Sequence, residues 1–272
     1  MFLKIFKHAF MRPFKTVIAM ACVSIIAGLF AGVFERLSDR LFAKMLVLMD
    51  TDSPELSKYN TLYSVFSTLK SFLTLAISIL TVFEIVVVYS AFNKAIATDE
   101  AYLTYTLPAK NGTQTGARYL SLFVWHVIIF AGATLSSVLI TMVSGTFDIA
   151  EILIEFDYLD VDAELIIALV ECTILGFVVF ASGIAQGQCG VVVTNALSHK
   201  LKRRIASFFV GLVYFIEIVF LPVLFVVLLV SALTYTFFIH VLIWIFIIII
   251  GSLGGLAYYL SYLLMGRRLN VA

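Results

Sequence analysis

Six apolar runs, each close to or above the length needed to cross a bilayer, follow one another along the chain. They cover residues 16–34, 64–91, 119–144, 164–194, 205–232 and 237–265. A transmembrane helix needs about 20 consecutive, mostly apolar residues. The pattern therefore predicts an all-α integral membrane protein with six transmembrane helices, which together form a single transmembrane domain over residues 1–272.

The chain begins with a short amphipathic segment. In residues 1–12, Phe2, Ile5 and Phe6 fall on one helical face, whereas Lys4 and Lys7 fall toward another. This pattern is typical of a helix that lies in the membrane interface, and a merely basic flank to the first span is the alternative. We expect an N-terminal interfacial helix at 1–12.

Small residues are frequent in the first span. Gly28 and Gly32 are four residues apart, a spacing that lets two membrane helices approach closely. Beyond this span, Leu37 and Leu41 continue the helical spacing with charged residues between them. The pattern predicts a helix that extends past the membrane and ends before Pro54.

The distribution of charge predicts the topology. Hydrophobic residues make up 62% of the chain and charged residues 13%, which is too apolar for a soluble domain. Thirteen of the 18 basic residues lie in 1–16, 92–118, 195–204 and the last few residues, whereas 35–61 and 146–163 hold eleven of the 17 acidic ones. By the positive-inside rule, the N-terminus, the C-terminus and the 92–118 loop are cytoplasmic.

The longest polar interval on the cytoplasmic side is TDEAYLTYTLPAKNGTQTGAR, residues 98–118. Asp99 and Glu100 are favourable in the first turn of a helix, and Pro108 marks where that helix should end. An apolar and aromatic ridge would be formed by Tyr102, Leu103, Tyr105 and Leu107. Such a ridge either binds a partner or rests on the lipid headgroups.

The ten residues DEAYLTYTLP, 99–108, resemble a segment of the compact, six-span ABC type-2 transporter permeases of Gram-positive bacteria. In that family this segment is a cytoplasmic coupling helix between spans two and three, which docks onto a separate ABC ATPase subunit. The resemblance implies ATPase docking by Asp99, Glu100, Tyr102, Leu103, Tyr105, Leu107 and Pro108. It also implies a second permease subunit, identical or closely related, and a bacterial cell membrane.

The function implied by the resemblance is ATP-driven export of amphipathic or hydrophobic peptides, such as antimicrobial, toxin or lantibiotic-like peptides. The sequence lacks the Gly-x-x-x-x-Gly-Lys-Ser/Thr motif of a P-loop ATPase, so we expect no enzyme activity in this chain and ATP and Mg bound by the partner. The four His residues have no metal-ligand spacing. The expected partners are the ATPase, the second permease subunit and membrane lipid, with no nucleic acid.

Three carboxyl groups inside the spans are candidates for a transport pathway: Glu84, Glu171 and Glu217. A charge at the bilayer centre costs at least about 2.5 kcal/mol, so these side chains should face protein or water. The alternative function is therefore an ion- or proton-coupled secondary carrier that uses these glutamates. The alternative for Glu217 is a packing carboxyl.

Two further polar residues inside the spans are Lys70, a candidate for an ion pair, and Ser182, a candidate nucleophile. Lys70 and Glu171 lie at similar distances from the outer ends of their spans, so they either pair or Lys70 extends to the outer headgroups. Ser182 in Ala181-Ser182-Gly183 resembles one part of an intramembrane serine protease site. No convincing His partner follows it, which favours a structural serine beside a helix-packing glycine.

Overall fold

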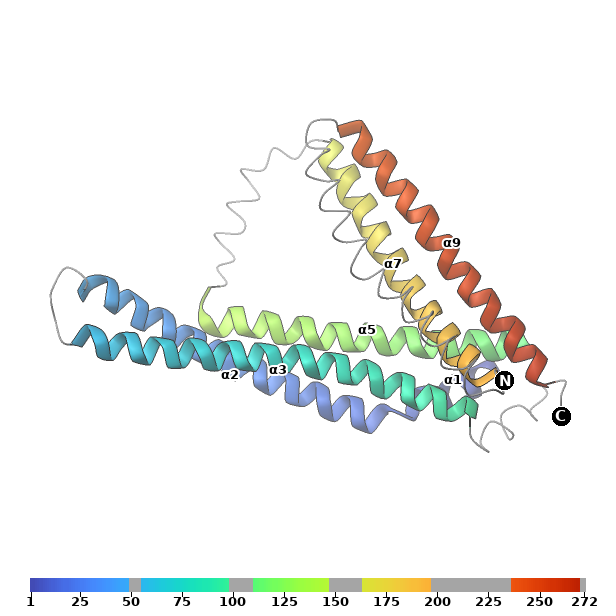
Figure 1. The fold of residues 1–272 in the computed structure, drawn as a ribbon, viewed down its shortest axis with the longest axis horizontal. Coiled ribbons are helices and arrows are strands. Elements are labelled where there is room, and N and C mark those ends of the chain that lie inside the picture. Colours follow the sequence, from blue (N-terminus) through green and yellow to red (C-terminus); the bar gives the residue numbers. More distant parts are fainter. Residues whose placement is uncertain (49–54, 98–109, 147–162, 197–235, 270–272) are drawn as a thin grey trace. The chain divides into compact units, whose positions relative to one another are not determined.

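The computed structural model describes residues 1–48, 55–97, 110–146, 163–196 and 236–269. Within these ranges the chain is helical and contains no strand. The helices are α1 (Phe2–Met11), α2 (Phe14–Leu48), α3 (Glu55–Ala97), α5 (Asn111–Ser144), α7 (Ala163–Ala196) and α9 (Thr236–Leu269) (Figure 1).

Five of these helices, all except α1, are long and apolar enough to cross a membrane. The prediction of an all-α, multi-pass membrane protein is confirmed at this level. The predicted fifth span, 205–232, and the predicted coupling helix at 99–108 lie outside the described residues. The count of six spans, the single domain and the cytoplasmic termini stay predictions.

The long helices continue past the apolar runs that predicted them. At 1.5 Å per residue, the 43 residues of α3 make a helix about 65 Å long, whereas the hydrocarbon core is about 30 Å thick. Helix α2 likewise runs to Leu48, so its predicted extension beyond the first span is confirmed.

The break between α1 and α2 is at Pro13, which has no backbone N–H to continue the first helix. Its carbonyl oxygen instead accepts a hydrogen bond from Val17 N at 3.0 Å, in the first turn of α2. Ile5 is buried on the apolar face of α1. The amphipathic N-terminal segment is thus a helix, and its place in the membrane interface stays a prediction.

Hydroxyl side chains along α3 are satisfied by the helix itself. Thr68, Ser71 and Thr74 are exposed, and each donates a hydrogen bond to the carbonyl oxygen four residues earlier, at 2.7 to 3.0 Å. This local bond satisfies the hydroxyl without a water partner. A helix with many Ser and Thr residues can therefore still expose those faces to lipid.

The described helices belong to two compact units. Unit 1 comprises residues 1–12, 89–124 and 160–272, and unit 2 comprises residues 13–88 and 125–159. Helices α3 and α5 each contribute one part to each unit.

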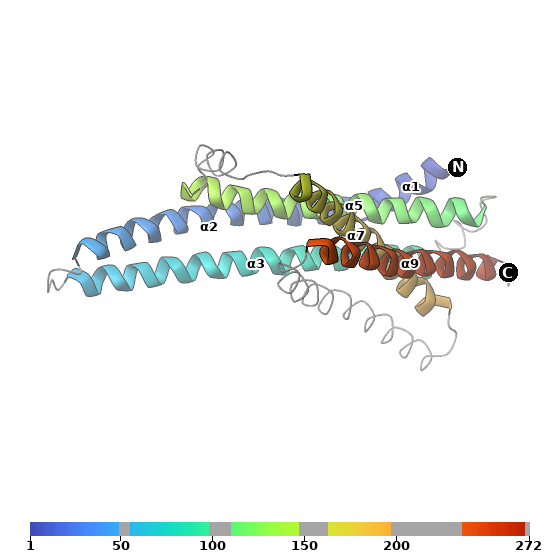
Figure 2. The same cartoon turned by 90° about the horizontal axis from the view of Figure 1, so that it is seen from above.

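In unit 2, α2 and α3 form an antiparallel pair (Figures 1 and 2). The rings of Phe34 and Phe66 stack between them with centroids 5.9 Å apart, and the Lys70 ammonium pairs with the Glu35 carboxylate. Pairing with Glu171 was one of the two alternatives for Lys70, and the structure instead pairs Lys70 with this carboxylate on the adjacent helix. The extension of Lys70 to the outer headgroups stays untested.

Helix α5 packs closely on α2 in the same unit. A Cβ atom on Gly28 would lie 2.8 Å from the carbonyl oxygen of Ser136, and one on Gly32 would lie 2.8 Å from that of Ile140. Both distances are shorter than any ordinary Cβ contact, so only glycine allows the two backbones to approach this closely. The close approach predicted from the Gly28 and Gly32 spacing is confirmed.

In unit 1, α7 and α9 run side by side (Figure 1). Ala185, Cys189 and Ala257 form a buried cluster between them. The first part of α5 joins this pair through Tyr119, which packs against the cluster. Small side chains at the centre bring the three helices together and leave room for the pocket described below.

Candidate functional site

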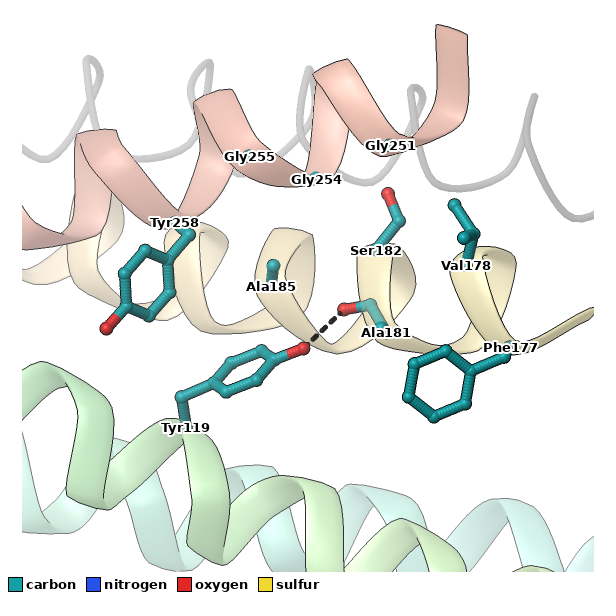
Figure 3. A pocket seen from close by; sticks show the side chains of 10 residues that line it. All are labelled: Tyr119, Phe177, Val178, Ala181, Ser182, Ala185, Gly251, Gly254, Gly255 and Tyr258. Carbon is teal, nitrogen blue, oxygen red and sulfur yellow. Dashed lines mark hydrogen bonds between the residues drawn. The ribbon is translucent and has the colours of Figure 1, made fainter. Parts of the chain in front are cut away.

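A pocket of about 520 Å³ lies in unit 1 between α5, α7 and α9. It is lined by Tyr119 of α5, Phe177, Val178, Ala181, Ser182 and Ala185 of α7, and Gly251, Gly254, Gly255 and Tyr258 of α9 (Figure 3). Its volume falls within the range of about 300 to 1,000 Å³ that is typical of ligand pockets.

The pocket is held on one side by a direct contact between α7 and α9. A Cβ atom on Gly254 would lie 2.8 Å from Cα of Ser182, so the two backbones touch at this point. The Ser182 hydroxyl donates a hydrogen bond to the carbonyl oxygen of Ile250 at 3.0 Å and accepts one from Nε2 of Gln186 at 3.2 Å. The Ser182 hydroxyl therefore joins α7 directly to α9.

The hydrogen bonds of Ser182 argue against a role as a nucleophile. Its hydroxyl donates a hydrogen bond to the carbonyl oxygen of Ile250, and among the described residues no His, Asp, Glu or Lys lines the pocket. A serine nucleophile needs an adjacent base to activate it. The geometry supports the structural role that the sequence favoured.

Tyr119 closes the pocket from the α5 side. Its hydroxyl donates a hydrogen bond to the carbonyl oxygen of Ala181 at 3.0 Å, and its ring meets the Tyr258 ring edge-on, with centroids 5.5 Å apart and an interplanar angle of 81°. Edge-to-face contacts of this kind are a favourable arrangement for aromatic pairs. The pocket wall is therefore aromatic and apolar, with its Ser182 and Tyr119 hydroxyls already bonded.

Elsewhere in unit 1, hydrogen bonds made by side chains connect the C-terminal ends of α3, α7 and α9 with the N-terminal end of α5. The Asn195 amide donates to Oδ1 of Asn93 at 2.6 Å, which joins α7 to α3. Nε2 of Gln188 donates to the carbonyl oxygen of Thr115 at 3.4 Å, and Oγ1 of Thr115 donates to Sδ of Met265 at 3.4 Å. We call these five residues the polar layer. It connects α3, α5, α7 and α9.

The polar layer lies beside the predicted docking segment along the chain. Helix α3 ends at Ala97, four residues after Asn93, and α5 begins at Asn111, four residues before Thr115. The predicted docking residues Asp99, Glu100, Tyr102, Leu103, Tyr105, Leu107 and Pro108 fall between these two ends and lie outside the described residues.

Glu171 is one of the three predicted pathway carboxyls. Its Oε2 lies 2.5 Å from Nδ1 of His240, and its Oε1 accepts a hydrogen bond from Nε1 of Trp244 at 2.8 Å. Both partners are on α9, one turn apart. The carboxyl thus faces protein and not lipid, as predicted. Its two contacts connect α7 to α9 near the N-terminal ends of both helices.

Glu84 is the second predicted pathway carboxyl, and it is buried in α3 with 3% of its surface exposed. It shares a buried stripe with Ile77 and Val88 at helical spacing. Its Oε1 has no hydrogen-bond partner within the ranges that the structure describes. Glu84 therefore faces protein, as predicted, and keeps one oxygen available. The third carboxyl, Glu217, lies outside the described residues.

Sequence reasoning missed the pocket and the partners of Glu171. The sixth span reads as a uniform Ile and Leu run, yet Gly251, Gly254, Gly255 and Tyr258 within it shape the pocket. That cluster of glycines was the feature of the sequence that could have indicated a pocket. His240 and Trp244, four residues apart at the start of the same helix, were the available signal for a carboxylate partner.

No group of three or more His, Cys, Asp or Glu side chains in the described part of the chain is placed to hold a metal ion. Comparison of the chain with protein-family models, with curated proteins and with solved structures finds no match.

Proposed function

We propose that this chain is the transmembrane permease subunit of an ATP-driven ABC exporter that moves amphipathic or hydrophobic peptides out of a bacterial cell. The observation that carries the proposal is the polar layer on both sides of residues 98–109. Asn93 before this segment bonds to α7, and Thr115 after it bonds to α7 and α9.

These bonds would allow a movement of the ATPase, acting on residues 98–109, to reach the transmembrane helices. The Gln188 and Thr115 side chains are buried, and a hydrogen bond between helices is strong where water is excluded, because a broken bond leaves its polar groups unpaired. A displacement of residues 98–109 would therefore be passed mainly through Thr115 to α7 and α9, and the exposed Asn93 adds a second bond to α7. These helices are also the ones that form the pocket.

The partner in this proposal is a separate ABC ATPase that holds ATP and Mg, with two permease subunits in the complete transporter. Tyr102, Leu103, Tyr105 and Leu107 would insert into the ATPase surface, and Asp99 and Glu100 would meet basic groups there. Truncating a central anchor of such an interface costs about 2 kcal/mol or more, which is roughly thirtyfold in affinity.

The test is co-purification of the ATPase with the tagged full chain, followed by measurement of ATP hydrolysis in the complex. The variant is Tyr102→Ala with Leu103→Ala, compared with wild type at matched expression. The matched control is Tyr259→Ala with Leu260→Ala, which removes the same side chains from exposed positions on α9. We expect loss of the ATPase from the first variant alone.

Full recruitment and full ATP hydrolysis in the Tyr102 and Leu103 variant would refute the docking role. Equal loss in both double variants would also refute it, because the effect would then not be specific to this segment. The alternative, a helix that rests on lipid headgroups, predicts unchanged recruitment.

One observation favours a second candidate function, a proton- or ion-coupled carrier. Glu84 is buried with one carboxyl oxygen unpartnered among the described residues, as a proton-carrying group would be. Glu171 supports this candidate less, because both of its oxygens are engaged by His240 and Trp244.

A further inference from the structure

We propose that the pocket between α5, α7 and α9 binds one acyl chain of a membrane phospholipid. The ester end of the chain would lie at the Tyr258 hydroxyl, and the hydrocarbon would extend past Ser182 toward Phe177 (Figure 3). This inference requires only that α7 and α9 lie in a membrane, and it does not depend on an ATPase partner.

The pocket opens to the surroundings of the helices. Phe177 is 60% exposed, and Gly251 and Gly255 are exposed as well. All three belong to the segments of α7 and α9 that are long and apolar enough to cross a membrane. In this proposal, the medium at the pocket mouth is the hydrocarbon of the bilayer.

The chemistry of the wall favours an acyl chain over a peptide. Each residue of a peptide brings an N–H and a C=O group, which are costly to bury without partners. The Ser182 hydroxyl is bonded to Ile250 and Gln186, and the Tyr119 hydroxyl is bonded to Ala181. A hydrocarbon chain needs no such partner.

The Tyr258 hydroxyl is the exception in the pocket wall. It makes no hydrogen bond within the described residues, and it faces the start of α5, where a Cβ atom on Gly116 would lie 3.5 Å away. A hydroxyl without a partner among the described residues suits one acceptor, such as the ester carbonyl of a phospholipid. The polar end of the lipid is therefore assigned to this end of the pocket.

Glycines keep the pocket open and supply the test. A Cβ atom on Gly255 would meet nothing within 4 Å, and Gly255 lines the pocket, so Gly255→Leu would add bulk to the pocket wall from an open position. Gly176 on α7 also has nothing within 4 Å of its Cβ position and does not line the pocket. Gly176→Leu is therefore a matched control with the same gain in helix propensity.

The experiment uses the purified full chain in phosphatidylcholine vesicles. The vesicles contain a small fraction of phosphatidylcholine with a photoreactive diazirine midway along one acyl chain. After illumination, mass spectrometry locates the labelled residues. We expect labelling concentrated on Phe177, Val178 and Ala181, reduced at least about fivefold by the added bulk of Gly255→Leu and unchanged in Gly176→Leu.

Two results would overturn the proposal. The first is labelling spread evenly over the exposed faces of α7 and α9 with no effect of Gly255→Leu. The second is preferential labelling of the pocket by a photoreactive amphipathic peptide that phospholipid does not displace, which would assign the pocket to peptide cargo.

The Tyr258 assignment has its own measurement. Tyr258→Phe removes the hydroxyl and keeps the ring, so pocket labelling by the ester phospholipid should weaken by about threefold, as expected for one lost hydrogen bond. A diether phospholipid lacks the carbonyl, so its labelling should not respond to Tyr258→Phe. Equal effects on both lipids would exclude the ester contact.

Discussion

Two glutamates that look alike in the sequence have different surroundings in the folded chain. Glu171 on α7 has both oxygens engaged by side chains of α9. Glu84 on α3 is buried beside apolar neighbours, and its Oε1 has no partner in the described ranges. A satisfied carboxyl stabilises a contact between helices, whereas a partly unsatisfied one is costly to bury and is a candidate for function.

At Glu171 we predict a loss of stability that depends on the replacement. Glu171→Gln keeps an oxygen that can accept the hydrogen bond from Trp244, whereas Glu171→Leu leaves both Trp244 and His240 without this partner. The second variant should be less stable than the first by about 1 kcal/mol, the usual value of one hydrogen bond. Thermal unfolding of the purified chain, followed by tryptophan fluorescence, measures this difference. A Glu171→Leu variant as stable as Glu171→Gln would contradict it.

At Glu84 we predict that the exporter tolerates loss of the ionisable group. Glu84→Gln keeps the shape of the side chain and removes any charge. An exporter driven by ATP does not need a proton on this group, so ATP-driven movement of a fluorescent amphipathic peptide should stay within about twofold of wild type. The secondary carrier makes the opposite prediction. Peptide movement driven by a proton gradient without ATP, and lost in well-folded Glu84→Gln protein, would replace the exporter with a carrier.

At the scale of helices, spacing of small residues decides which faces meet. Gly28 and Gly32 bring α2 against α5 in unit 2, and Gly254 brings α9 against Ser182 of α7 in unit 1. Helix association in lipid gains little from the hydrophobic effect, so close van der Waals contact and hydrogen bonds between helices carry it. A single methyl group at such a position therefore has a large effect.

The contact between α2 and α5 supplies a matched pair of variants. Gly28→Ala would place Cβ 2.8 Å from the Ser136 carbonyl oxygen, and overpacking of this kind costs about 1 to 3 kcal/mol. Gly132→Ala, on α5 in the same unit, would place Cβ 3.9 Å from Cβ of Ala21, which is an ordinary contact. It should be neutral or stabilise by up to about 1 kcal/mol through helix propensity.

Thermal unfolding midpoints of the two purified variants measure this contrast. Equal stability of Gly28→Ala and wild type would mean that α2 and α5 do not pack at this distance. A loss of stability in Gly132→Ala as large as that in Gly28→Ala would show that any added methyl group is harmful, whether or not the two backbones approach closely at that position.

At the scale of the whole molecule, charge decides which side of the membrane each connection faces. We predict that single cysteines at positions 111, 200 and 270 react with a membrane-impermeant reagent from the cytoplasm, and those at 52 and 157 from outside, because basic residues concentrate around the first set. Labelling in intact and in permeabilised cells distinguishes the two sides. Reaction of positions 52 and 111 from the same side would overturn the topology.

Much of the fold could be predicted from the sequence because it depends on local properties. Long apolar runs predicted the five long helices among those that the structure describes, the amphipathic pattern of residues 1–12 predicted α1, and the spacing of Gly28 and Gly32 predicted a close contact. Helix ends were less certain. Backbone hydrogen bonding continues into polar residues, so α3 begins at Glu55, nine residues before its apolar run.

The amino-acid sequence by itself determined that the chain is helical and suited to a membrane, because chain length and hydropathy act on each segment separately. Only the tertiary structure decided which residues meet: Lys70 with Glu35, and Glu171 with His240 and Trp244. The pocket also belongs to this level, since its wall joins Tyr119, Ser182 and Tyr258 from three helices. Partner choice depends on how helices rotate and slide against one another, and the hydrophobic pattern of a single helix carries too little information to specify that.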